Sequence, residues 1–213
     1  MNQHQAEELI FQALETEQCG VRLYRGAMKC AVNPDLKLDW REYLRHTENH
    51  ERILRDLCET LGLDHAKETP GRLIVRKRSD AMIAAMESAL EEGDPVLAQL
   101  VAAECVVDAE TKDHLNWNLI REVSNKVTGP EGKAMRAAFD LVEEEEDEHL
   151  YYTMGWTREL WLQSLGLPVE LPPAEEKKDV RTAIGAARAR QARKPKNGGV
   201  TLADEVWRQP IAS

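Results

Sequence analysis

Acidic side chains and imidazoles recur in this chain at positions where the spacing of apolar residues places the core of long helices. Glu17 and Glu110 are each followed, seven residues later, by an aromatic residue. A second helical pattern follows each of these segments and carries a histidine on its apolar stripe, His50 in the first pair and His149 in the second. Because residues seven apart lie on one helix face, the chain is predicted to contain two similar helix pairs with ionisable groups turned inward.

Helical periodicity dominates the sequence. Apolar residues repeat every three to four positions in four long segments, 5–31, 36–62, 95–126 and 131–165, and in a shorter one at 79–92. The alternating pattern of β-strands is missing from the sequence. These observations predict an all-α protein, an antiparallel four-helix bundle whose long crossover contains a short extra helix.

The composition changes near the C-terminus. Residues 1–168 are expected to form the bundle, and residues 169–213 a Pro/Ala/Arg-rich tail that is either disordered or docked on the bundle or on a neighbouring subunit. The segment 171–213 has nine Lys and Arg against five Asp and Glu, although the whole chain carries a net charge of −10. Since the remainder of the chain is strongly acidic, nucleic acid is not an expected partner.

Several classes of protein are excluded by missing features. No apolar run approaches the roughly 20 residues that span a bilayer, and the N-terminus lacks the basic and apolar regions of a signal peptide, so a cytoplasmic protein is expected. The four cysteines form no CxxC pair and are expected to be reduced packing residues. The sequence contains no phosphate-binding loop, nucleophile elbow or HExxH motif.

The inward acids need compensation, because a buried carboxylate costs several kcal/mol unless it is paired or binds a cation. Within the acidic run 143–148, only Glu146 lies on the line that joins Val142 and His149. Glu146 and His149 are three residues apart and can therefore hold one ion together. An oxygen-rich set with imidazoles suits iron or manganese. The alternative is a metal-free helical scaffold in which histidine and arginine neutralise a polar core layer.

Glu17 and Glu110 on two helices, with Glu146-x-x-His149 on a third, resemble the ferritin-like superfamily, in particular rubrerythrins and bacterial stress-associated ferritin-like proteins. Members of that superfamily carry one Glu on each of two helices and Glu-x-x-His on each of the other two. The resemblance covers roughly residues 5–166. It implies a core site that holds two iron ions, with manganese as the alternative metal. It also implies oxidation linked to O2 or peroxide, or iron sequestration, and a homodimer. The ligands that it implies are Glu17, His50, Glu110, Glu146 and His149.

The chain departs from this family at Thr47, where a sixth ligand, a carboxylate, is expected. Binding of one metal, or of none, is therefore also compatible with the sequence, and a manganese catalase is disfavoured. The two aromatic residues that follow Glu17 and Glu110 are interpreted first as core filling and second as neighbours of the site. Candidate replacements for the missing ligand are Glu48, His46, Glu51, His114 and Asp113.

Overall fold

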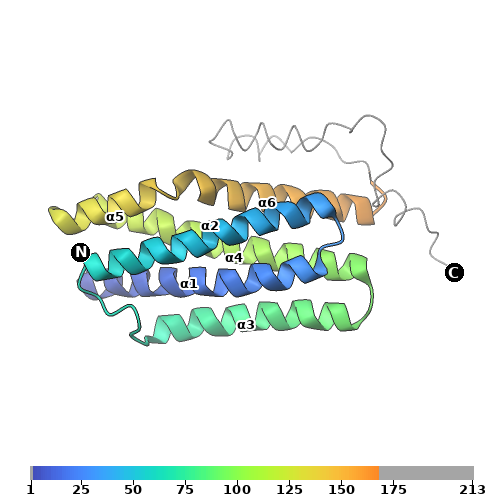
Figure 1. Ribbon diagram of the computed structural model, residues 1–213, viewed down its shortest axis with the longest axis horizontal. Helices are drawn as coiled ribbons and strands as arrows, with labels where there is room; N and C mark the ends of the chain where they lie inside the picture. The colour runs from blue at the N-terminus through green and yellow to red at the C-terminus, as the bar shows by residue number, and fades with distance from the viewer. Residues whose placement is uncertain (1, 168–213) are drawn as a thin grey trace.

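The computed structural model describes residues 2–167, and these residues form helices and no strand (Figure 1). The all-α prediction is thus confirmed for this part of the chain, and the expected tail at 169–213 lies outside it. No helix within 2–167 combines the length and apolar character needed to cross a membrane. The helices are α1 (Gln3–Cys30), α2 (Pro34–Thr60), α3 (Pro70–Glu91), α4 (Pro95–Ser124), α5 (Pro130–Asp140) and α6 (Glu143–Ser164).

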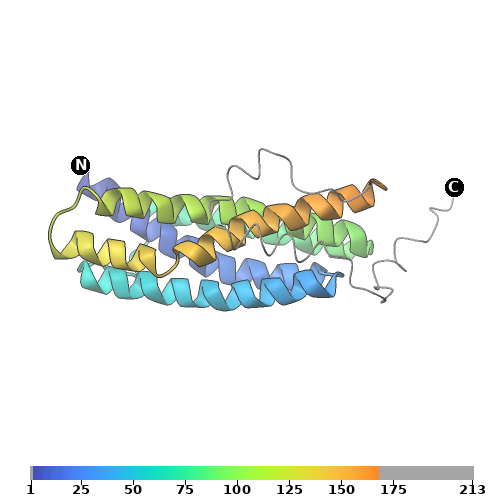
Figure 2. The ribbon, with the colours of Figure 1, turned by 90° about the horizontal axis from the view of Figure 1, so that it is seen from above.

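The helices lie side by side along one long axis (Figures 1 and 2). Helix α1 packs against α2, α3 and α4, and α4 packs against α1, α3, α5 and α6. Helices α5 and α6 follow one another along α4, so together they occupy the length of one long helix. Helix α3 contacts α1 and α4 from the outside. The space between α1, α2, α4 and the α5–α6 pair is therefore the interior.

The predicted fourth helix, 131–165, is wrong as a single element, because the structure interrupts it at Leu141 and Val142. Helix α6 restarts at Glu143, so the acids at 143–146 occupy its first turn. Carboxylates are stabilised at a helix N-terminus by the unpaired N–H groups and the helix dipole. Apolar periodicity continues across the interruption, which is why the sequence pattern concealed it.

Helix α3 is also longer than predicted: it begins at Pro70, and the expectation of 79–92 captured only its second half. Helices α2, α3 and α4 begin in the same way. Asn33, Thr69 and Asp94 each accept a hydrogen bond from a first-turn N–H, and a proline follows each of them. Proline suits this position because its missing N–H would have no partner there.

Glycine is required at both ends of the connection between α2 and α3. Gly62 has a φ of 68°, a left-handed conformation that ends α2 where the sequence predicted. The N–H of Gly71 donates to Glu8 Oε1 over 2.9 Å. A Cβ at position 71 would lie only 1.9 Å from that oxygen, so a larger residue would displace the Glu8 side chain and break this hydrogen bond.

Two apolar clusters fill the interior, one toward each end of the helices. On α1, Ile10 and Leu14 belong to one cluster and Leu23 and Ala27 to the other, with Glu17 between them. The stripes of α2, α4 and the α5–α6 pair show the same order of apolar, polar and apolar residues. A polar layer therefore crosses the middle of the protein.

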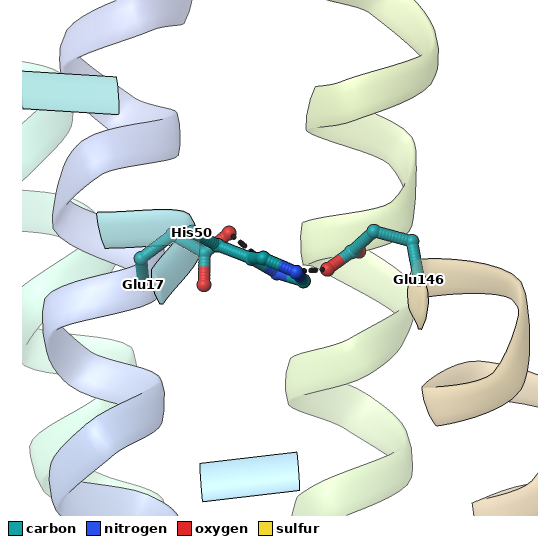
Figure 3. Close-up of side chains that lie close together, drawn as sticks. All are labelled: Glu17, His50 and Glu146. Carbon is teal, nitrogen blue, oxygen red and sulfur yellow. Dashed lines mark ion pairs between the residues drawn. The ribbon is translucent and has the colours of Figure 1, made fainter. Parts of the chain in front are cut away.

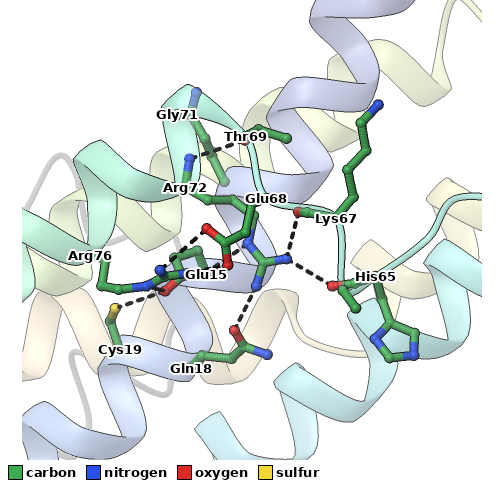
Figure 4. A network of polar contacts seen from close by, with 12 residues as sticks. Glu15, Gln18, Cys19, His65, Lys67, Glu68, Thr69, Gly71, Arg72 and Arg76 are labelled. Carbon is green, nitrogen blue, oxygen red and sulfur yellow. Dashed lines mark hydrogen bonds and ion pairs between the residues drawn. The ribbon is translucent and has the colours of Figure 1, made fainter.

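A buried ion-pair network fixes α3 and its preceding loop to α1 (Figure 4). Glu15 accepts hydrogen bonds from Arg72 Nε (2.8 Å) and Arg76 Nε (2.7 Å). Arg72 also donates to the carbonyl oxygens of His65 and Lys67. Burial alone would raise the pKa of the Glu15 carboxyl, but the two arginines outweigh burial and hold that pKa below its usual value.

We expect Glu15→Gln to lower the free energy of unfolding by about 3 kcal/mol, because it leaves the buried Arg72 guanidinium without its counter-charge. Urea unfolding followed by circular dichroism measures this change. Glu68→Gln is the control, since Glu68 pairs with Arg76 at the surface, and it should cost less than about 1 kcal/mol. Equal effects of the two substitutions would contradict the assigned role of Glu15.

Candidate metal centre

The polar layer contains all five residues that the resemblance implies as ligands. Two further side chains in the layer, Thr47 and Asp113, are buried as well. Helices α1, α2, α4 and α6 each contribute to it, as the heptad spacing predicted. The exposed fraction is at most 4% for all five candidates, Glu17, His50, Glu110, Glu146 and His149.

Three of these side chains converge on one point (Figure 3). His50 Nδ1 lies 2.9 Å from Glu146 Oε1 and 3.6 Å from Glu17 Oε1. One potential ligand atom from each residue lies within 4.8 Å of the other two, and residues 2–167 contain no other such set. We call Glu17, His50 and Glu146 the triad. Although the 2.9 Å contact is short, its direction is not that of a hydrogen bond, so it is an ion pair.

The other two candidates form a pair beside the triad. His149 Nδ1 lies 3.5 Å from Glu110 Oε2. The rings of His50 and His149 are stacked, with their centroids 5.7 Å apart. The two halves of the sequence repeat thus meet in one layer, and the triad combines Glu17 and His50 of the first half with Glu146 of the second.

Both buried imidazoles turn Nδ1 toward carboxylates and Nε2 toward an outer partner. His50 Nε2 donates to Glu145 Oε2 over 2.7 Å, and His149 Nε2 lies 3.1 Å from His46 Nδ1. Metal-binding histidines are commonly oriented in this way, with the second nitrogen held by a carboxylate. Sequence analysis missed Glu145, because it lies beside the apolar stripe and only the folded chain brings it to His50.

The charge on His50 depends on these neighbours. Burial alone would lower its pKa, but Glu17, Glu145 and Glu146 outweigh burial and hold the pKa of His50 well above its usual value. Without a cation, His50 is therefore an imidazolium that partly neutralises the acids. A metal ion would replace the Nδ1 proton, while Nε2–H would keep its bond to Glu145.

The two aromatic residues of the repeat bind the glutamates crosswise. Trp117 Nε1 donates to Glu17 Oε1 over 2.8 Å, and the Tyr24 hydroxyl donates to Glu110 Oε1 over 2.7 Å. Burial and the nearby Glu110 raise the pKa of Tyr24 well above its usual value, so its hydroxyl remains a donor. These residues do more than fill the core, because each fixes one carboxylate oxygen and leaves the other free.

Several buried oxygens in this layer make no hydrogen bond. Buried polar atoms normally have a partner, so such a group calls for an explanation such as a cation. Burial raises the pKa of Glu17, and burial with three nearby glutamates raises that of Asp113 well above its usual value. The oxygens without a hydrogen bond are Glu17 Oε2, Glu110 Oε2, Asp113 Oδ1 and both oxygens of Glu146.

Thr47 occupies the position of the missing carboxylate, and it is buried against α1. A Cβ on Gly20 would lie 3.1 Å from the Thr47 methyl carbon, so the two helices are close at this point. A longer acidic side chain at position 47 would have to displace neighbours in this layer. Nothing at position 47 supplies a negative charge.

Most of the proposed replacements for that carboxylate point elsewhere. Glu48 pairs with Arg25 at the surface, Glu51 pairs with Arg55, and His114 pairs with Asp147 outside the layer. These three expectations are wrong in this structure. Asp113 is the acid that lies inside the layer, and His46 reaches the layer through His149.

Comparison with known proteins adds no assignment. No protein-family model matches the chain, and neither a curated protein nor a solved structure is significantly similar to it. The resemblance to ferritin-like proteins therefore stays a prediction from the residues quoted above.

Proposed function

We propose that this protein is a ferritin-like metal-binding protein that holds iron, or manganese, between Glu17, His50 and Glu146. The observation that carries the proposal is that these three buried side chains converge. Three carboxylate oxygens of the two glutamates make no hydrogen bond. Carboxylates with a single imidazole form a hard, oxygen-rich donor set that fits these cations better than a structural zinc site.

A second ion would be held by Glu110 and His149, with Asp113 as the nearest additional carboxylate. We propose that this position binds more weakly than the triad, because Thr47 removes one acid from the layer. Iron in such a centre would supply redox chemistry toward O2 or peroxide, or a place to sequester the metal. The chain's own residues orient the ligands: Trp117 and Tyr24 hold the glutamates, and Glu145 holds His50.

We expect the purified protein, loaded anaerobically with Fe(II) and desalted, to retain at least one iron per chain. Glu17→Gln and Glu146→Gln should each weaken iron binding by at least about tenfold, because each removes a charged ligand. Glu144→Gln is a matched control from the same acidic run, since Glu144 is exposed. Elemental analysis measures the retained iron, and protein free of iron and manganese after loading would overturn the proposal.

Glu145→Gln should weaken iron binding by roughly tenfold or more without abolishing it, because it removes the anion that orients the His50 ring. Isothermal titration with Fe(II) under argon gives the dissociation constant. Affinity equal to that of Glu144→Gln would show that Glu145 has no part in the centre.

The metal-free scaffold is the second candidate function, and the protonated His50 among carboxylates favours it. The two candidates differ in thermal stability. A ligand that binds only the folded state raises the melting temperature, so Fe(II) or Mn(II) should raise it for the unmodified protein and not for Glu146→Gln. In a scaffold, Glu146→Gln would be as stable as the unmodified chain or more so, and neither metal would change either melting temperature.

A further inference from the structure

A surface pocket opens beside the interruption between α5 and α6. Its volume is about 320 Å³, and its walls come from α4, α5 and α6. Acidic and imidazole side chains are prominent in the lining, among them His114, Glu143 and Asp147. The pocket is therefore a polar opening on the side of the protein where the helix is broken.

The inner wall of this pocket belongs to the candidate centre. Glu146 lines it, is only 2% exposed, and has two carboxylate oxygens without a hydrogen bond. Trp117 also lines the pocket, and its indole N–H holds Glu17 on the far side. A molecule in the pocket would thus reach a triad residue without crossing either apolar cluster.

The outer part of the pocket has donors that suit a cation. His114 Nε2 and Asp147 Oδ1 lie 2.9 Å apart, and both side chains are partly exposed. Arg121 is the basic residue in the lining, and it lies near Glu122 (3.7 Å) and Glu143 (3.8 Å), which offset its charge. The lining contains three acids, Glu143, Glu146 and Asp147, and one arginine, so acids outnumber basic residues and the pocket attracts cations.

A second pocket, between α1, α3 and α4, has a different character. It is lined largely by apolar side chains, such as Leu23, Val75 and Met82, and no member of the triad lies in its wall. Two basic residues, Arg78 and Lys112, line it beside a single acid, Asp108, so this pocket attracts a cation less than the polar one does. The polar pocket is the better path for an ion.

We propose that the pocket at the α5–α6 interruption is the entry route by which a hydrated divalent cation reaches the triad. His114 and Asp147 hold the ion first, and Glu146 receives it at the inner end. This inference rests on the proposed metal centre and adds the path and the residues that control the rate of loading. It requires that changes at the outer end alter the rate at which the ion reaches the triad.

The test is stopped-flow loading of the metal-free protein with Co²⁺ alone, followed by the visible absorption of bound cobalt. Asp147→Lys should slow loading on the order of tenfold, because it reverses the charge at the outer end. Glu144→Lys makes the same change in net charge on an exposed residue that does not line the pocket, and it should load at nearly the unmodified rate. Glu144→Lys should also bind as much Co²⁺ at equilibrium as the unmodified protein.

A second pair of variants tests whether a side chain that fills the pocket slows loading. Asn118→Trp places a large side chain in the pocket and should slow loading, whereas Thr111→Trp lies exposed on the same helix outside the pocket and should not. Unchanged rates for both Asp147→Lys and Asn118→Trp, with full Co²⁺ binding, would overturn the route and leave the metal centre standing. No Co²⁺ binding by the unmodified protein would instead overturn the centre, and the route with it.

Discussion

A layer of carboxylates between two apolar clusters is the constraint on which the rest of this structure depends. Glu17, Glu110, Asp113 and Glu146 are all nearly inaccessible to water, and within residues 2–167 no lysine or arginine forms an ion pair with them. Burial of several acids together is unfavourable unless protons or a cation compensate them. Burial raises the pKa of Glu17 and of Asp113, and the acids around His50 outweigh burial and raise its pKa, so these shifts favour proton binding within the layer.

The interruption between α5 and α6 affects one of the acids in this layer. A continuous helix would place Glu146 in its middle, where the backbone N–H groups are already bonded, whereas the restart at Glu143 places it in the first turn. The N-terminal end of a helix favours negative charge, so the interruption offsets part of the cost of burying Glu146. It also leaves room for the polar pocket on that side. One local change in the backbone thus accounts for both a stabilised acid and an opening toward it.

The sequence predicted the composition of the layer well, because heptad spacing is a property of each helix taken alone. Spacing selected Glu146 from an acidic run in which Glu143 and Glu144 are exposed, and it placed His50 and His149 inward. The spacing did not predict Glu145 as the partner of His50, because this contact joins residues 95 positions apart. The first half of α3 was missed for a similar reason, since its Arg72 and Arg76 look like surface residues until Glu15 is placed beside them.

The two halves of the repeat differ at one position of the layer, where the first half has Thr47 and the second has Glu146. Had residue 47 been acidic, five carboxyl groups would share the layer with two imidazoles, and one cation would leave most of their charge uncompensated. With Thr47 the triad gathers two acids and His50 around a single point, while Glu110 keeps one oxygen on Tyr24 and turns the other to His149. A single ion bound by the triad would relieve the most crowded part of the layer. The asymmetry of the sequence therefore favours one strong position and one weak position over two equal ones.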